Sequence, residues 1–332
     1  MTSLDDALTT AAAQTDFSGV VRVDRLGEPP LVRAFGLAHR EYGVPMTPDT
    51  RLGIASGSKA FTALAVMSLV EEGLLSLTTT ARSLLGSDLP LVDDEVTVEH
   101  LLAHRSGIGD YLDDDADSGD YLMTVPVHLL ATTEQFLAVL DGHPQSFPPG
   151  ERFAYCNGGY VVLALLAERA SGVSYHDLVR QRVLAPAGMT ATDFLRGDDL
   201  PGDAAVGYVE VDGEVRTNVL HLPVLASGDG GAYSTVADLH RFWTALLAGR
   251  IVSTQTVAAM TTPYSDVPEE DARYGLGFWL AESGDELRLE GADAGVSFCS
   301  RHSASSGTTW TVVSNTSDGA WPLAQEVVDA LG

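Results

Sequence analysis

The sequence predicts an α+β protein in which a β-containing domain is split by a helical insertion. Strand-like runs rich in Val and Leu occur near the N-terminus, at residues 19–38, and return after residue 205. The part between them, residues 80–196, follows mostly helical periodicity broken by loops. We therefore expect residues 1–79 and 197–332 to pack together as one domain, with residues 80–196 as a separate helical domain.

The N-terminal part is predicted to begin with a helix and a hairpin. Ser3 is a candidate N-cap for a helix over residues 3–14, whose first turn carries acidic residues where the helix dipole favours them. Runs at residues 19–25 and 30–38 flank a Gly-Glu-Pro-Pro turn, which indicates two paired strands. From Ser56 onward the apolar residues recur with helical spacing, so this serine is expected at the start of a buried helix.

The later elements follow from the same patterns. An Asp-Gly pair at residues 212–213 predicts a tight turn between two strands. Further helices are expected at residues 97–104, 134–140, 160–171, 175–184, 236–247 and 323–331. Further strands are expected at residues 206–211, 214–219, 274–281, 286–290, 296–301 and 308–314.

The composition excludes several classes of protein. The chain has 332 residues and is 45% hydrophobic and 20% charged, which is typical of a folded globular protein. Its longest apolar run, residues 160–167, is far shorter than the roughly 18 residues that span a bilayer, so no membrane segment is expected. A formal net charge of -27 opposes binding to phosphate backbones and anionic lipids, so neither nucleic acid nor a membrane is expected as a partner.

The N-terminal residues and the cysteines favour a reducing, cytoplasmic location. The first ten residues contain no Lys or Arg and lead into no apolar stretch, so no secretory signal is predicted. Cys156 and Cys299 lie far apart and form no metal-ligand or redox spacing. Both are expected to be reduced thiols.

One lysine stands among 18 arginines. Lys59 follows Ser56 by three residues in Ala-Ser-Gly-Ser-Lys, and residues three apart share a face of a helix. A serine becomes nucleophilic when a base takes its proton, and a lysine can be that base if burial lowers its pKa. A guanidinium stays protonated and cannot replace it. The pattern predicts Ser56 as nucleophile and Lys59 as base, against the alternative of a chance spacing.

Five segments surround this pair in a fixed order. They are Tyr42-Gly-Val-Pro-Met-Thr-Pro-Asp-Thr, Val98-Glu-His-Leu-Leu-Ala-His-Arg-Ser-Gly-Ile, Phe147-Pro-Pro-Gly-Glu-Arg-Phe-Ala-Tyr-Cys-Asn-Gly-Gly-Tyr, Ala185-Pro-Ala-Gly-Met-Thr and Gly230-Gly-Ala-Tyr-Ser-Thr-Val-Ala-Asp-Leu. With them, residues 18–331 resemble the serine β-lactamase and penicillin-binding protein superfamily, in the class C β-lactamase-related branch that includes esterases and D-amino-acid peptidases. The resemblance implies a β-lactamase/transpeptidase-like fold, with an antiparallel sheet flanked by helices and an all-helical insertion domain.

The family's Tyr-x-Asn motif matches Tyr155-Cys156-Asn157. By this resemblance Tyr155 is the general acid and base that moves protons between the serine, the lysine and the leaving group. Asn157 orients the substrate or Lys59. Without the family, Tyr155 would be interpreted as a packed aromatic residue with its hydroxyl on water.

The third motif departs from the family's pattern. The family places Lys-Thr-Gly or His-x-Gly on the strand beside the site, and the matching triplet here is Ala292-Asp293-Ala294. The cation that would hold a β-lactam or D-Ala carboxylate is therefore missing, which argues against β-lactamase and carboxypeptidase activity. Arg301 or His302 is an alternative source of that charge.

The same segment suggests two substrate-binding residues. Asp293 can attract a cationic or hydroxylated group instead of a carboxylate. A backbone amide near Gly295 can join the N–H of Ser56 to form an oxyanion hole, which is usually the largest catalytic contribution.

Two patterns suggest a metal site but are incomplete. His100 and His104 are four residues apart on a helix without a third ligand. The run Asp113, Asp115 and Asp117 opens like a calcium loop but lacks the later Gly and Glu. We expect a structural role for the histidines, a solvated loop for the acids, and no metal.

These features together predict a serine hydrolase that works through an acyl-enzyme on small esters or amides, without a cofactor. One alternative is β-lactamase or D-Ala/D-amino-acid peptidase activity. Another is a catalytically silent binding module of the penicillin-binding-protein type. The expected partner is a small-molecule ester, amide or β-lactam.

Overall fold

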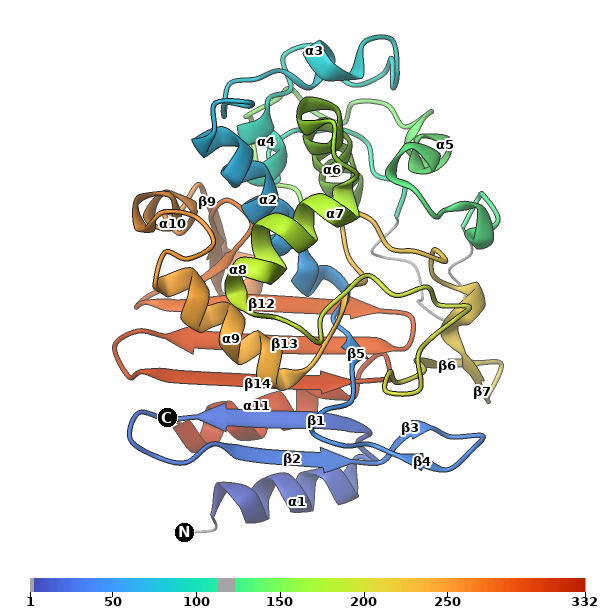
Figure 1. Ribbon diagram of the computed structural model, residues 1–332, viewed down its shortest axis with the longest axis vertical. Helices are drawn as coiled ribbons and strands as arrows, with labels where there is room; N and C mark the ends of the chain where they lie inside the picture. Colours follow the sequence, from blue (N-terminus) through green and yellow to red (C-terminus); the bar gives the residue numbers. More distant parts are fainter. Residues whose placement is uncertain (1–2, 113–122, 332) are drawn as a thin grey trace.

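The computed structural model describes residues 3–112 and 123–331, with helices on both faces of a large antiparallel sheet (Figure 1). The helices are α1 (Leu4–Gln14), α2 (Lys59–Glu71), α3 (Ala81–Leu85), α4 (Val98–Leu102), α5 (Leu137–Leu140), α6 (Asn157–Ser171), α7 (Tyr175–Val179), α8 (Ala185–Ala187), α9 (Val236–Leu247), α10 (Thr254–Met260) and α11 (Ala320–Leu331). The strands are β1 (Gly19–Asp24), β2 (Leu31–Phe35), β3 (Leu37–His39), β4 (Val44–Pro45), β5 (Leu52–Gly53), β6 (Tyr208–Val211), β7 (Glu214–Thr217), β8 (Tyr233–Ser234), β9 (Ser265–Val267), β10 (Ala272–Tyr274), β11 (Trp279–Ala281), β12 (Glu286–Asp293), β13 (Val296–Ser303) and β14 (Thr308–Ser314). None of the helices in these residues is both long and apolar enough to cross a membrane.

The large sheet joins the two ends of the chain. Its strand order is β2-β1-β14-β13-β12-β11-β10-β9, so β1 lies between its own hairpin partner and a strand from the C-terminal part. The register of β1 with β14 runs from Gly19 opposite Ser314 to Asp24 opposite Thr309. The expected packing of the N-terminal strands against the C-terminal strands is confirmed.

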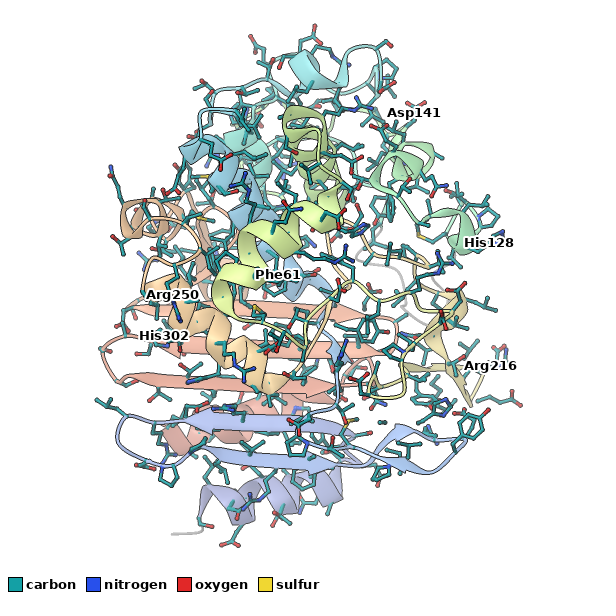
Figure 2. All side chains as sticks on the ribbon, viewed as in Figure 1. Phe61, His128, Asp141, Arg216, Arg250 and His302 are labelled. Carbon is teal, nitrogen blue, oxygen red and sulfur yellow. The ribbon has the colours of Figure 1, made fainter. Side chains whose placement is uncertain are left out.

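Alternate residues of the central strands point to opposite faces of the sheet and build two cores. On one face, α1 and α11 pack on each other and cover Val21 and Val312. On the other face, Val20 and Val313 belong to a larger core that includes α2 and α9, with Phe61 fully buried in it (Figure 2). Burial on both faces therefore holds the sheet rigidly beneath the start of α2.

The larger core continues without a break into the helical part of the chain. α6 is buried from Asn157 to Ala167 and packs against α2 and α4. Gly228 allows a neighbouring segment to approach closely, because a β-carbon there would lie 2.1 Å from the carbonyl oxygen of Tyr160. Since the two parts share this core, the division into residues 1–79 with 197–332 and residues 80–196 stays a prediction.

Most predicted elements are confirmed, and the differences have physical causes. α9 has the predicted bounds, and the Asp212-Gly213 turn joins β6 to β7 with both residues at positive φ. Residues 274–281 form β10 and β11 rather than one strand. Gly275 and Gly277 turn the chain between them: a β-carbon on Gly275 would meet the backbone of α10 at 2.1 Å, and Gly277 has a φ of 88°. The short helix α10 was not predicted.

A buried carboxylate fixes the start of α9. Asp238 is fully buried and accepts hydrogen bonds from the Ala191 N–H at 2.7 Å, the Thr192 hydroxyl at 2.8 Å and the Arg241 guanidinium at 2.5 Å. Asp177 occupies the same position in α7, three residues after the N-cap serine and three before an arginine, but it is exposed. The two aspartates differ mainly in burial.

Asp238→Ala is expected to lower the free energy of unfolding by about 2–4 kcal/mol, because buried donors lose a charged acceptor. Asp177→Ala, the matched exposed change, should cost about 1 kcal/mol or less. Chemical denaturation of both variants measures the difference. Equal losses would show that burial of Asp238 does not matter for stability.

Candidate active site

Ser56 lies in a short 3₁₀ turn, Ala55–Ser58, between β5 and α2. Ala55 has a φ of 42°, an uncommon conformation for a residue with a β-carbon. Gly57 lies against Phe298 of β13, and a β-carbon on it would come within 2.3 Å of that ring. Ser56 is therefore held in a tight turn on the face of the sheet, immediately before the helix rather than inside it.

Lys59 is the first residue of α2 and is only 3% exposed. Its Nζ donates to Ser56 Oγ at 2.8 Å, to Asn157 Oδ1 at 2.7 Å and to the carbonyl oxygen of Asp229 at 2.5 Å. An ammonium has three N–H donors, and these contacts use all of them. The three-residue spacing in the sequence thus corresponds to direct contact between the serine and lysine side chains.

The pKa of Lys59 shifts in the direction opposite to the expected one. Burial by itself lowers the pKa of the ammonium, but the negative charges of Tyr155, Asp229 and Asp110 outweigh burial and raise it above its ordinary value. The condition under which Lys59 could act as the base, a pKa lowered by burial, is therefore not met. At neutral pH Lys59 is an ammonium that donates to Ser56 and has no lone pair to accept the serine's proton.

Tyr155 lies between Lys59 and a buried histidine. Lys59 Nζ is 4.9 Å from the centroid of the Tyr155 ring, and His104 packs on that ring with centroids 4.3 Å apart. Nδ1 of His104 accepts a hydrogen bond from the Cys156 N–H at 3.1 Å. Burial and the charge of Lys59 lower the pKa of His104 well below its ordinary value, so the ring is neutral. His104 therefore positions the backbone and ring of the Tyr155 segment.

Asn157 begins α6, and its backbone is held by Asp110, a residue that the sequence analysis missed. Asp110 Oδ2 accepts from the Asn157 N–H at 2.5 Å, and Oδ1 accepts from the Gly158 N–H at 2.8 Å. A carboxylate at a helix N-terminus satisfies N–H groups without helical partners and matches the positive end of the helix dipole. Asp110 thus fixes the position from which Asn157 reaches Lys59.

Asp229 was also missed as a site residue. Its carbonyl oxygen accepts from Lys59, and its carboxylate accepts from the Tyr111 hydroxyl at 2.5 Å. Burial raises the pKa of the Asp229 carboxyl above its ordinary value, although Lys59 and Tyr111 oppose the shift. The sequence offers one indication of this role: Asp229 directly precedes Gly230-Gly231, the first two residues of the fifth family segment.

Strand β12 passes directly against Ser56. A β-carbon on Gly291 would lie 2.7 Å from Ser56 N and 2.9 Å from Gly57 N, so a glycine is required for this approach. The glycine-ended triplet beside the nucleophile is therefore residues 289–291, Leu-Glu-Gly, and the expected match to residues 292–294 is wrong by three positions. Neither triplet contains the lysine or histidine of the family's pattern.

The register of β12 with β13 shows which backbone amides of β12 point away from β13. Asp293 closes the hairpin, so Ala292 occupies a non-hydrogen-bonded pair and its N–H points away from β13. This edge of β12 is open because β11 pairs with it only as far as Arg288. The expectation for Gly295 is wrong: at the hairpin tip its N–H donates to Ser317 Oγ at 2.9 Å.

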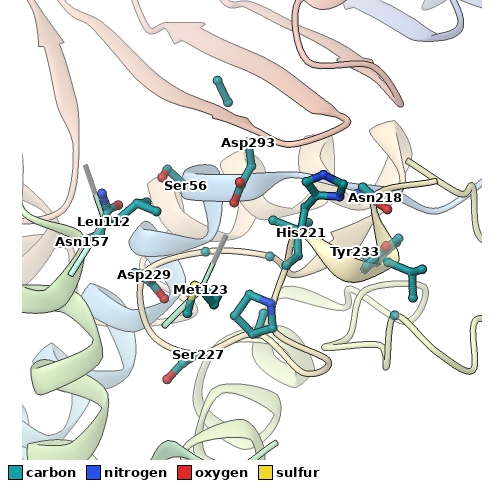
Figure 3. Close-up of a pocket in the computed structure, with 18 of the residues that line it drawn as sticks. Ser56, Leu112, Met123, Asn157, Asn218, His221, Ser227, Asp229, Tyr233 and Asp293 are labelled. Atoms are coloured by element: carbon teal, nitrogen blue, oxygen red, sulfur yellow. The ribbon is translucent and has the colours of Figure 1, made fainter. Parts of the chain in front are cut away.

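Two hollows meet at Ser56, and Ser56 and Ala292 are the described residues that line both. The narrow hollow holds about 870 Å³ of empty space, including space open to solvent, and is also lined by Asn157, Asn218, His221, Ser227, Asp229 and Asp293 (Figure 3). The wide hollow holds about 1470 Å³ of such space and is also lined by Arg152, Tyr155, Asp266, Trp279 and Glu290. A substrate bound across Ser56 would extend into both.

The suggested substitutes for the missing cation lie elsewhere. Arg301 pairs with Glu286 at 3.4 Å and with Glu290 at 3.1 Å. His302 stacks on Trp243 near the end of β13, far along the strand from the hairpin (Figure 2). Neither lines the narrow or the wide hollow in the described part of the chain.

The candidate metal patterns do not form a site in the described residues. Within residues 3–112 and 123–331, no group of three or more His, Cys, Asp or Glu could hold a metal ion. His100 Nδ1 accepts from the Thr97 N–H in a capping box at the start of α4. Asp113, Asp115 and Asp117 lie outside the described residues.

Both cysteines are buried free thiols, as expected. Cys156 Sγ accepts from the Gly159 N–H at 3.3 Å and caps α6, and burial raises the pKa of its thiol well above its ordinary value. Burial likewise raises the pKa of Cys299. Neither thiol is available as a thiolate nucleophile at neutral pH.

Comparisons with known proteins agree with this geometry. A family model described as Beta-lactamase matches residues 4–326. Penicillin-binding protein 4* of Bacillus subtilis is 30% identical over 296 residues, which cover 84% of this chain and 63% of that protein. The D-aminopeptidase of Brucella anthropi is 29% identical over 283 residues, covering 82% and 50%. The crystal structure of a penicillin binding protein from Bacillus halodurans has a TM-score of 0.91 at 34% identity, covering 98% of this chain and all of that one. The chain thus spans between half and two thirds of the two curated relatives.

Because Lys59 is the single lysine of the chain, its ammonium can be observed directly by NMR. Protein labelled with ¹⁵N-lysine is expected to keep the ammonium chemical shift up to and beyond pH 10.5, because neighbouring negative charge raises the pKa. Tyr155→Phe removes part of that charge and should lower the midpoint. A midpoint clearly below 10.5 in the unmodified protein would refute the raised pKa.

Proposed function

The chain belongs to the beta-lactamase family, and we propose that it is a serine hydrolase that cleaves small esters or amides through an acyl-enzyme. The observation that carries the proposal is the 2.8 Å hydrogen bond from Lys59 Nζ to Ser56 Oγ where the two hollows meet. The β-lactamase/transpeptidase-like fold itself is confirmed by the similarity to the Bacillus halodurans protein.

In the proposed first half-reaction, Ser56 Oγ attacks the substrate carbonyl and its proton passes to Tyr155 Oη, which has to enter this step deprotonated. The raised pKa of Lys59 favours this assignment, because an ammonium can stabilise the transferred negative charge but cannot accept the proton. The N–H groups of Ser56 and Ala292 donate to the oxyanion of the tetrahedral intermediate. The register of β12 supports that role for Ala292.

The first half-reaction ends when the bond to the leaving group breaks: Tyr155 returns its proton to the leaving atom, and the acyl group stays as an ester on Ser56 Oγ. In the second half-reaction a water molecule attacks the ester while Tyr155 accepts its proton. When the ester bond breaks, that proton passes to Ser56 Oγ, which restores the enzyme. One residue can serve as acid and base in turn because the two steps are mirror images.

The three contacts of Lys59 explain why an arginine could not replace it at this position. An ammonium is compact and directs its donors to Ser56, Asn157 and Asp229 from a single nitrogen. A guanidinium is planar and larger, so it cannot meet three acceptors that converge on one point. Asn157 is proposed to hold the ammonium in this position.

The walls of the narrow hollow favour groups without a carboxylate. The triplet at residues 289–291 and the described lining of the narrow hollow contain no lysine or arginine, whereas Arg152 lines the wide hollow. A carboxylate bound in the narrow hollow would therefore have its charge unpaired. The name of the D-aminopeptidase relative supports an amide among the bonds that can be cleaved.

A fluorophosphonate probe is expected to label Ser56, and mass spectrometry of the digested protein identifies the modified residue. Ser56→Ala should abolish both labelling and hydrolysis of a nitrophenyl ester, whereas Ser76→Ala, a change of an exposed serine, should affect neither. A protein that retains a fluorescent penicillin but hydrolyses no ester, anilide or cephalosporin would instead be a binding module. If the unmodified protein hydrolysed the nitrophenyl ester no faster than the Ser56→Ala variant, the assignment as an enzyme would be refuted.

Tyr155→Phe is expected to lower kcat for a nitrophenyl ester by about 100-fold or more, because the proton acceptor is lost while the ring stays packed. Tyr42→Phe is the matched control, since that tyrosine is exposed and outside the site. Lys59→Arg should also abolish turnover. Thermal unfolding of each variant separates a chemical effect from misfolding, and full activity of a folded Tyr155→Phe protein would refute the role of the hydroxyl.

A further inference from the structure

The wide hollow is the side of the site from which the leaving group departs. In the proposed chemistry Tyr155 must contact the leaving atom to protonate it, and Tyr155 lines the wide hollow but not the narrow one. The acyl group stays attached to Ser56, which lines both hollows, and extends to the other side. The side chains of the wide hollow therefore determine which leaving groups fit.

Aromatic rings form much of the wall of the wide hollow. Phe153, Tyr155, Trp279 and Trp321 line it, and all four are partly exposed. The ring of Trp279 lies nearly parallel to that of Tyr155, at an angle of 12° and with the centroids 6.1 Å apart. A substituent carried by a leaving atom at Tyr155 therefore lies beside the indole. An aromatic face attracts a cation within about 6 Å of its centroid, and tryptophan does so most strongly.

Acidic side chains line the same hollow. Asp266 on β9 and Glu269 and Glu270, which follow that strand, are exposed, and none of the three forms an ion pair within residues 3–112 and 123–331. Glu290 also lines the hollow, but Arg301 holds its carboxylate at 3.1 Å. Three carboxylates therefore remain available to a cationic ligand beside the aromatic wall.

One arginine opposes these acids. Arg152 is the single lysine or arginine among the described residues that line the wide hollow. Its guanidinium lies over the ring of Phe147, 4.3 Å from the centroid, and Phe147 is not part of the lining. An anionic leaving group would meet this one charge together with three unpaired carboxylates, whereas a cationic one would meet an excess of opposite charge.

We propose, resting on the acyl-enzyme function above, that the wide hollow binds a cationic leaving group. The substrate class is esters and amides whose leaving alcohol or amine also carries an ammonium group, quaternary or protonated. The face of Trp279 receives the ammonium, and Asp266, Glu269 and Glu270 supply the opposite charge. The acyl bond breaks as before: the leaving oxygen or nitrogen takes the proton of Tyr155 and carries the cation away with it.

Three butanoyl thioesters with different leaving groups test this proposal. Thiocholine carries a quaternary ammonium, 3,3-dimethylbutanethiol is its neutral isostere, and 2-mercaptoethanesulfonate carries an anion. A disulfide reagent detects each released thiol, and the protein adds little background because Cys156 and Cys299 are buried. The kcat/KM for the thiocholine ester is expected to be about tenfold or more above that of the isostere, and the sulfonate should be the poorest substrate.

Trp279→Leu is expected to lower the ratio of kcat/KM between the thiocholine ester and its isostere by about threefold or more, because the aromatic face is lost. A change in the packing of Tyr155 would slow both esters alike and leave this ratio unchanged. If Trp279→Leu fails to fold, a variant that changes exposed residues alone tests the charge.

That variant is the triple change Asp266→Asn, Glu269→Gln and Glu270→Gln, which should lower the same ratio by about threefold or more. Added salt should lower it in the unmodified enzyme by screening the carboxylates. The matched control removes as much charge at exposed residues outside both hollows and should leave the ratio unchanged. It carries Asp141→Asn, Glu95→Gln and Glu210→Gln.

The outcomes separate this inference from the function on which it rests. If a nitrophenyl ester is hydrolysed in a Ser56-dependent way but the thiocholine ester is not preferred over its isostere, the hydrolase stands and the cation site is refuted. A preference for the sulfonate would refute it as well and would assign the hollow to anions held by Arg152. An unchanged ratio in the folded triple variant also refutes it. If no ester is hydrolysed faster than by Ser56→Ala, both proposals fail.

Discussion

The buried ammonium of Lys59 is the interaction on which the rest of the site depends. It connects the turn before α2, the start of α6 and the glycine-rich segment at Asp229, which lie far apart along the chain. A charge in the interior is tolerated only when it is paired and fully hydrogen-bonded. The carboxylates of Asp110 and Asp229 and the capping of α6 can therefore be understood as the surroundings that this one charge requires.

This charge arrangement also gives the site its polarity. Lys59 lies buried behind Ser56 with its donors occupied, while acidic side chains outnumber the one arginine, Arg152, on the described walls of the two hollows in front of it. The chain as a whole is also negative, with a formal net charge of -27. Near the cleft, the field therefore repels anions and concentrates cations before any specific contact is made.

Local patterns in the sequence predict what depends on local geometry. The bounds of α9, the Asp-Gly turn and the Ser56-Lys59 contact follow from periodicity and spacing within a few residues. Other features depend on distant segments that folding brings together, so no local pattern in the sequence indicates them. These features are the pKa of Lys59 and the roles of Asp110 and Asp229. The position of the third motif could be fixed only by the close approach of Gly291 to Ser56.

The pairing of β1 with β14 has a consequence for synthesis on the ribosome. Gly19 finds its partner Ser314 only after the intervening residues 20–313 have been translated, and β12 joins the serine turn almost as late. Such non-local pairing slows folding and delays the formation of the sheet. Ser56, the proposed nucleophile, therefore emerges from the ribosome long before β12, the strand that would supply the second amide of the proposed oxyanion hole.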